Sequence, residues 1–197
     1  MHDQETSQII SKGWYDSGYL PHFDGGQIAQ FITYRLSGTI PSHVRRFHKS
    51  QLEQQLISEV EYHNAIDKYL DEGRGPVYLR EPMIAEMVEE NLLRFHQQRY
   101  FLYEWVLMPN HAHVLLLPLE GVSLSSIVHS AKSYTGNQAN RLLKRSGPFW
   151  AREYYDRYIR NAEHFFNTVE YIRNNPVKAA LCERPEDWRF SSARRVV

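Results

Sequence analysis

Two histidines separated by one residue lie in the segment Asn110-His111-Ala112-His113-Val114. Apolar runs at residues 105–108 and 114–117 flank them, and Pro109-Asn110 between the runs is a turn signal. If both runs are strands, His111 and His113 project from the same face, because residues two apart in a strand point the same way. Two neutral imidazoles held side by side are half of a divalent-metal site. Alternatively, the two histidines face solvent from the strand or form hydrogen bonds within the core.

A second pair of polar side chains lies on a helix predicted from Asn161 to about Asn174 and ended by Pro176. Tyr171 and Asn175 are four residues apart and share one helix face. If that face packs against the histidine strand, two imidazoles and the Asn175 carbonyl oxygen can hold a divalent cation, Mg²⁺ or Mn²⁺. Tyr171 is then placed as a nucleophile toward a phosphate that the metal polarises.

Each residue of this pair also has a plain structural interpretation. Tyr171 fits a core aromatic residue whose hydroxyl reaches solvent, and Asn175 fits a helix-terminating residue before proline. The chain has 13 tyrosines, and Tyr134 on the preceding predicted helix is a rival nucleophile. A tyrosine has an ordinary pKa of about 10, so its attack at neutral pH needs a nearby cation or base.

The elements that must position these residues follow from hydrophobic periodicity. We predict strands at 30–36, 100–108 and 111–117, a fourth strand from 149–150 and 154–159, and helices at about 49–70, from 82, and at 123–143. This order predicts an α+β fold with a ferredoxin-like antiparallel sheet, helices on one face, an elaborated first crossover and an extra C-terminal helix. We expect one domain over residues 1–197, with an irregular N-terminal arm at 1–26 and a possible helical insertion at about 49–80.

Bulk composition restricts the class of protein. The chain has 197 residues, 42% of them hydrophobic, which suffices for one domain with a core. A single cysteine, Cys182, excludes an intramolecular disulfide and any multi-cysteine zinc site, and is compatible with a reducing cytoplasm. We expect no membrane partner, because no apolar run approaches the roughly 20 residues that span a bilayer and the N-terminus lacks a signal-peptide pattern.

Charge is distributed unevenly along a neutral chain. From Lys132 onward there are 13 Lys and Arg against 7 Asp and Glu, a net charge of +6, so residues 1–131 carry −6. This asymmetry predicts a basic face suited to nucleic acid, although ordinary charge scatter also explains it. The candidate phosphate contacts are Lys132, Arg152, Arg157, Arg160, Arg173 and Lys178, and the candidate base-stacking residues are Trp150, Tyr154 and Tyr155. Each of these cations is alternatively a solvated charge on the surface. About half of the aromatic residues on a strand must belong to the core. His129 and His164 fit surface residues better than metal ligands.

Three blocks of sequence add a family resemblance. They are WVLMPNHAH at 105–113, GPFWAREYYDR at 147–157 and EYIRNNPVKA at 170–179, with a tail DWRFSS at 187–192. Together they resemble the REP-associated tyrosine transposases, a group of single-tyrosine HUH transposases. The resemblance implies that His111 and His113 are metal ligands, that Asn175 is a candidate third ligand and that Tyr171 is the nucleophile. The implied reaction is a transesterification on single-stranded or hairpin DNA, which leaves a 5′-phosphotyrosine and a free 3′-OH.

One departure and several alternatives accompany this resemblance. The family pattern has a bulky hydrophobic residue between the histidines, where this chain has Ala112; that position faces away from the metal, so the change affects packing more than ligation. The resemblance implies a bacterial, nucleoid-associated protein in the cytoplasm that acts as a monomer or homodimer. Two rival functions remain: a domesticated DNA-hairpin-binding protein that does not cleave, and a metal-dependent phosphodiesterase that uses water.

Overall fold

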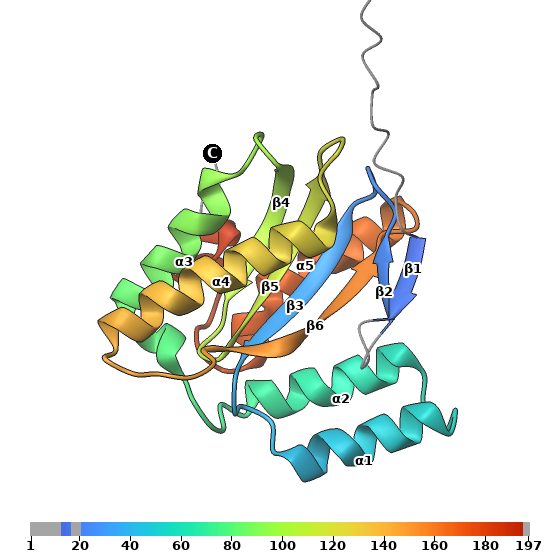
Figure 1. Ribbon diagram of the computed structural model, residues 1–197, viewed down its shortest axis with the longest axis horizontal. Helices are drawn as coiled ribbons and strands as arrows, with labels where there is room; N and C mark the ends of the chain where they lie inside the picture. The colour runs from blue at the N-terminus through green and yellow to red at the C-terminus, as the bar shows by residue number, and fades with distance from the viewer. Residues whose placement is uncertain (1–12, 17–20, 195–197) are drawn as a thin grey trace, which may run out of the picture.

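Four antiparallel strands form the sheet that carries the two histidines (Figure 1). A computed structural model describes residues 13–16 and 21–194. The strand order is β4 (Tyr100–Leu107), β5 (His111–Pro118), β3 (Gln30–Leu36) and β6 (Trp150–Tyr158). These ranges confirm the predicted strands, whose β-branched and aromatic side chains suit a pleated surface. In the register of β3 with β5, Thr33 lies opposite His113, and Arg35 lies opposite His111.

Helices cover both faces of this sheet. Helices α3 (Pro82–Arg94) and α4 (Leu124–Leu142) pack on the face that carries Ile32 and Val114, whereas α5 (Ala162–Lys178) packs on the face that carries Leu115. Figure 1 shows α3 and α4 in front of the sheet and α5 behind it. The α+β class with an antiparallel sheet is confirmed, but the prediction that the helices share one face is wrong. Both alternating sets of β5 residues are buried, so both faces need a covering layer.

The segment predicted to be one long helix forms two helices. Helix α1 (Ser42–Glu53) ends before a turn in which Gln55 has a φ of 58°, and α2 (Glu59–Asp71) begins after Ser58. The hydroxyl of Ser58 accepts a hydrogen bond from the Glu61 amide at 3.3 Å, and the Glu61 carboxylate accepts one from the Ser58 amide at 2.8 Å. This reciprocal cap fixes the start of α2. Figure 1 shows α1 and α2 side by side below the sheet, in the region predicted as a helical insertion.

The last helix continues through Pro176 instead of ending before it. The residue before a proline is biased away from the helical region, which was the reason to expect a stop, and proline also lacks the N–H that bonds to the carbonyl four residues back. The carbonyls of Asn175 and Pro176 nevertheless accept hydrogen bonds from the amides of Ala179 and Leu181 at 3.0 and 2.9 Å. One missing bond near the end of a long helix is therefore tolerated, and Lys178 stays on the helix two turns after Tyr171.

The ends of the chain complete the architecture. Strands β1 (Gly13–Asp16) and β2 (Pro21–Asp24) pair antiparallel, so the prediction of an irregular arm is wrong for these residues, while 1–12 and 17–20 lie outside the described residues. Short 3₁₀ turns occupy 78–80, 185–187 and 192–194. Within the described residues, we find no helix that combines the length and apolarity needed to cross a membrane.

Candidate active site

His111 and His113 lie side by side on β5, as the two-residue period predicts. Both are fully buried, and their Nε2 atoms are 3.0 Å apart. Ala112 between them is buried on the opposite face with Val114, which confirms that it points away from the imidazoles. The strand therefore presents two ring nitrogens to one point.

The other ring nitrogen of each histidine has a fixed partner. Asn110 Oδ1 accepts a hydrogen bond from His111 Nδ1 at 2.7 Å, while the Asn110 amide nitrogen donates to the carbonyl of Leu70 on α2 at 3.0 Å. Thr33 Oγ1 lies 2.7 Å from His113 Nδ1 and can accept its proton. Partners of this kind orient metal-binding imidazoles and leave Nε2 with a lone pair.

Burial also sets the charge of the pair. It lowers the pKa of His111 to about 3 and holds the pKa of His113 well below its ordinary value, where the neighbouring His111 and His63 act in the same direction. Both rings are therefore neutral at pH 7, which is the form that binds metal.

Helix α5 packs against the histidine strand and brings Tyr171 to His113. The ring centroids of Tyr171 and His113 are 5.3 Å apart, and Ile172 packs with Leu115 beneath them. Asn175 is fully buried, and within the described residues neither its Oδ1 nor its Nδ2 has a hydrogen-bond partner. A buried amide left in this way costs roughly 1–3 kcal/mol, which marks it as a position that a ligand can satisfy.

The donor set fits a divalent ion only when Asn175 is included. Among the described residues, no group of three or more His, Cys, Asp or Glu side chains is arranged to hold a metal. Two nitrogens bound cis to one ion at about 2.1 Å stand about 3.0 Å apart in an octahedral arrangement. The Nε2 separation matches that value. The two imidazoles therefore fit adjacent positions around a cation, and the unpartnered Asn175 amide on α5 is the candidate third ligand.

Three polar residues of α2 face this centre, and the sequence analysis did not identify them. The Tyr171 hydroxyl donates a short hydrogen bond to Asp67 Oδ2. The same oxygen lies 3.0 Å from His63 Nε2 and 3.9 Å from His113 Nε2, and Asp71 Oδ1 lies 4.0 Å from His111 Nε2. His63 and Asp67 are four residues apart, a spacing that places them on one helix face and was a signal available in the sequence.

Burial shifts the acid–base properties of these groups. It raises the pKa of Asp67 to about 8 against the opposing effect of the Tyr171 hydrogen bond, and raises that of Asp71 to about 6. It also raises the pKa of Tyr171, and the Asp67 charge and hydrogen bond add to this. The nucleophile candidate is therefore a protonated phenol at neutral pH. Lys178, predicted as a phosphate contact, lies with its Nζ 5.0 Å from the centre of the Tyr171 ring.

A small cavity opens beside Tyr171. Its volume is about 180 Å³, and Arg157, His164 and Tyr155 contribute to its lining. Tyr155 stacks on His63 with ring centroids 3.8 Å apart, so it packs against the site. The predicted cation Arg157 thus lies near the nucleophile candidate, and His164 lines this cavity instead of facing open solvent.

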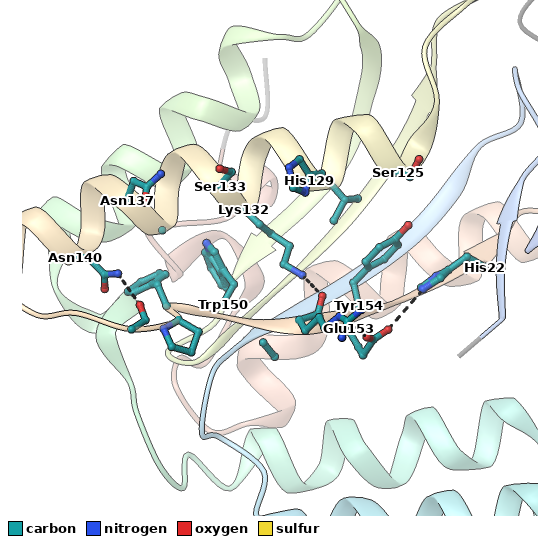
Figure 2. A pocket seen from close by; sticks show the side chains of 17 residues that line it. His22, Ser125, His129, Lys132, Ser133, Asn137, Asn140, Trp150, Glu153 and Tyr154 are labelled. Atoms are coloured by element: carbon teal, nitrogen blue, oxygen red, sulfur yellow. Dashed lines mark hydrogen bonds and ion pairs between the residues drawn. The ribbon is translucent and has the colours of Figure 1, made fainter. Parts of the chain in front are cut away.

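The other predicted DNA contacts separate into four groups. Lys132, Arg152 and Tyr154 line a groove on the other side of the sheet, the α4–β6 groove (Figure 2), and Arg160 is exposed. Trp150 is buried, and its Nε1 donates to Thr135 Oγ1 at 2.8 Å, so it is a core residue and not a stacking platform. Arg173 forms a bidentate pair with buried Glu104 at 2.9 and 3.2 Å. The rival nucleophile Tyr134 is exposed on α4, away from the histidine face.

Comparison with known proteins supports the family resemblance that the three sequence blocks indicate. A family described as "Transposase IS200 like" matches residues 78–175. The resemblance is confirmed. The chain is 28% identical over 114 residues to the REP-associated tyrosine transposase of Escherichia coli (strain K12), covering 57% of this chain and 66% of that one. It is 29% identical over 101 residues to a putative REP-associated tyrosine transposase of Haemophilus influenzae, covering 46% and 57%.

A solved structure shares the fold. It is described as a REP-associated tyrosine transposase bound to a REP hairpin, with a TM-score of 0.57, 19% identity and coverage of 92% of this chain and 82% of that one. The chain spans about two thirds or less of the length of the two curated relatives. The block that matches the IS200-like family includes His111, His113, Tyr171 and Asn175, but it begins after α2 and its Asp67.

Proposed function

We propose that this protein nicks and rejoins single-stranded DNA at or near hairpins, with Tyr171 as nucleophile and with a divalent metal held by His111, His113 and Asn175. The observation that supports the proposal is that the paired histidines of β5 lie against Tyr171 of α5, which also carries the buried, unpartnered amide of Asn175. The names of the relatives support transposase chemistry, and the hairpin bound to the solved relative supports a hairpin substrate.

In the proposed reaction, the Tyr171 oxygen forms a bond to a backbone phosphorus while the bond from phosphorus to the 3′ oxygen breaks. In its ionised form Asp67, whose Oδ2 accepts the hydroxyl hydrogen bond, is placed to take the phenolic proton, and the departing 3′ oxygen gains a proton from solvent. The products are a 5′-phosphotyrosine and a free 3′-OH, which can reverse the step. A bound Mg²⁺ or Mn²⁺ supplies Lewis-acid polarisation of the phosphate.

One chain supplies the whole set of side chains in this site. Tyr171 and the histidines that it approaches belong to the same chain, so the arrangement supports action by a monomer, with a homodimer not required for chemistry. A DNA substrate also fits the expected place of the protein, on the bacterial nucleoid in the cytoplasm.

The test uses a labelled DNA hairpin with single-stranded flanks, incubated with Mg²⁺ or Mn²⁺ and resolved on a denaturing gel. We expect a covalent protein–DNA band that disappears in Tyr171→Phe and remains in Tyr134→Phe, a matched control on α4. Cleavage without a covalent band that survives Tyr171→Phe indicates the water-using phosphodiesterase. Tight hairpin binding without cleavage in either metal indicates the non-cleaving binding protein.

A further inference from the structure

Helix α2 ends at Asp71, and the carboxylate of this residue faces the histidine pair. Asp71 Oδ1 lies 4.0 Å from Nε2 of the fully buried His111. Among the described residues, the other carboxylate within 4.0 Å of either Nε2 atom is Asp67, at 3.9 Å from His113. Asp67 and Asp71 are four residues apart, so one face of α2 presents both to the same centre. The proposed reaction gives Asp67 a proton to accept and leaves Asp71 without a role.

Asp71 is not satisfied by the protein around it. Its Oδ1 atom is buried and has no hydrogen-bond partner among the described residues. The carboxylate of the next residue, Glu72, instead pairs with Arg74 Nε at 2.8 Å. The Asp71 side chain is 21% exposed and that of Glu72 is 42% exposed, so both reach solvent. Asp71 therefore keeps an unpaired oxygen on its inner side, whereas its neighbour forms an ordinary surface ion pair.

The position of Asp71 is also electrostatically unfavourable. Asp71 is the last residue of an α-helix, where the helix dipole favours cations over anions. Burial raises the pKa of both carboxyls of α2, and the charge of Asp71 raises the pKa of Asp67 further. Lys178 on α5 opposes both shifts. A divalent cation at the centre relieves all of these costs together.

The metal proposed for this centre needs a negative ligand. His111 and His113 are neutral at pH 7 and the Asn175 amide carries no charge, so these three ligands leave the charge of a divalent ion uncompensated. A buried charge is stable only when it is paired. Mg²⁺ and Mn²⁺ also prefer carboxylate oxygens. The other carboxylate of α2 is already engaged by the tyrosine hydroxyl, so Asp71 is the available one.

The distance between Asp71 and the histidines supports direct ligation. Two ligands held at about 2.1 Å from one ion stand about 3.0 Å apart when they are adjacent and about 4.2 Å apart when they are opposite. The 4.0 Å between Asp71 Oδ1 and His111 Nε2 lies within these limits. Because it is close to the wider limit, Asp71, His111 and His113 do not, as the described residues stand, form a closed set of three. Asp71 ends its helix and is partly exposed, so its side chain has room to turn toward an ion.

We propose that Asp71 is a fourth protein ligand of the divalent ion, contributed by α2, and that its negative charge lets the centre hold the ion before DNA binds. This inference rests on the metal site of the proposed function. The block that matches the transposase family begins at residue 78, so Asp71 lies outside it. Helix α2 then supplies both the proton acceptor and a metal ligand from one face.

Metal binding in the absence of DNA tests this inference. Free Mn²⁺ in water gives a six-line EPR signal that is lost when the ion binds to protein, so a titration measures the affinity. We expect Asp71→Asn, which keeps the size of the side chain but removes its charge, to weaken Mn²⁺ binding at least about tenfold. Glu72→Gln is the matched control and should bind Mn²⁺ normally. His111→Ala defines the signal expected when the site is lost.

Two further measurements distinguish a ligand from a structural residue. In the adduct assay, Asp71→Asn should need about tenfold more Mn²⁺ for the half-maximal rate, and excess Mn²⁺ should restore the rate. Asp71→Glu, which keeps a carboxylate, should retain more Mn²⁺ affinity than Asp71→Asn. Thermal melting in EDTA verifies that the variants fold, and Asp71→Ser replaces Asp71→Asn if the latter does not. Unchanged Mn²⁺ affinity in Asp71→Asn, an equal loss in Glu72→Gln, or no Mn²⁺ binding by the unaltered protein would overturn the proposal.

The two proposals fail separately. If the unaltered protein forms no covalent adduct but Asp71→Asn still loses Mn²⁺ affinity, the nicking proposal is wrong and the ligand proposal stands. If the adduct forms and Asp71→Asn binds Mn²⁺ normally, the ligand proposal is wrong and the nicking proposal stands.

Discussion

The histidine centre and the α4–β6 groove lie on opposite faces of the same sheet, and their polar side chains are held in opposite ways. In the centre, Thr33 of β3, Asp67 of α2 and Asn110 of the β4–β5 turn hold His113, Tyr171 and His111 by hydrogen bonds. In the groove between α4 and β6, the polar side chains of α4 are exposed to solvent. The contrast teaches that reacting groups need geometry set in advance, whereas polar side chains in an open groove can take their hydrogen bonds from water.

The largest loss of adduct formation should come from a substitution in the histidine centre. We expect His113→Ala to reduce formation of the covalent adduct roughly 10³-fold, because one of the two proposed imidazole ligands is lost. Hairpin affinity should change little, and EDTA should reproduce the defect in the unaltered protein. The matched control is His129→Ala in the groove. If His129→Ala abolishes adduct formation as His113→Ala does, the division between the two faces is wrong.

A smaller effect should follow from Asp67, which belongs to the centre but lies outside the block that matches the family. We expect Asp67→Ala to slow adduct formation about 100-fold, because the Tyr171 hydroxyl loses its hydrogen-bond acceptor. Single-turnover kinetics with separate measurement of hairpin affinity checks this, with Glu72→Ala as the control. A faster reaction in Asp67→Ala would show that this carboxyl restrains the nucleophile instead of assisting it.

Arg173 was predicted to contact DNA, and its substitution tests whether it does so or instead has a structural role outside both the histidine centre and the groove. Its pairing with Glu104, which is 4% exposed, indicates a structural role. Because Arg173 itself is 43% exposed and screened by solvent, we expect Arg173→Gln to lower the free energy of unfolding by about 1–2 kcal/mol. Chemical denaturation measures this. The salt dependence of DNA binding should stay the same, and a reduced slope would return Arg173 to the DNA surface.

The smallest effect concerns the residue between the histidines. Ala112 is buried among the side chains of the α3–α4 face, so Ala112→Val adds two methyl groups to a filled core. We expect a loss of stability of about 1 kcal/mol with normal adduct formation. Thermal melting and the adduct assay check both parts. A large loss of activity at normal stability would mean that this position influences ligation across the strand.

Local sequence patterns were sufficient for the strands and for the pairs of residues within the site. The two-residue period of β5 put His111 and His113 on one face, and the four-residue spacing on α5 did the same for Tyr171 and Asn175. These predictions succeeded because each depends on the geometry of a single element, which nearby residues dictate.

Other features could not be obtained from local patterns. Trp150 looked like a stacking residue but is buried, because alternation along a strand does not tell which face is covered. The helix expected over 49–70 is divided by a turn, since apolar spacing continued across the cap at Ser58. The burial pattern of β5 required helices on both faces, which the assumed plan of the fold had not included.

By itself, then, the sequence determined which side chains are available for chemistry and how they pair within β5 and within α5. Only the tertiary structure decided that those two elements meet, that Asp67 of α2 receives the hydroxyl of a tyrosine 104 residues away, and that α4 and β6 form a groove on the far face. The physical reason is that periodicity is a property of one element, whereas contacts between distant elements arise from burying apolar faces of all of them together.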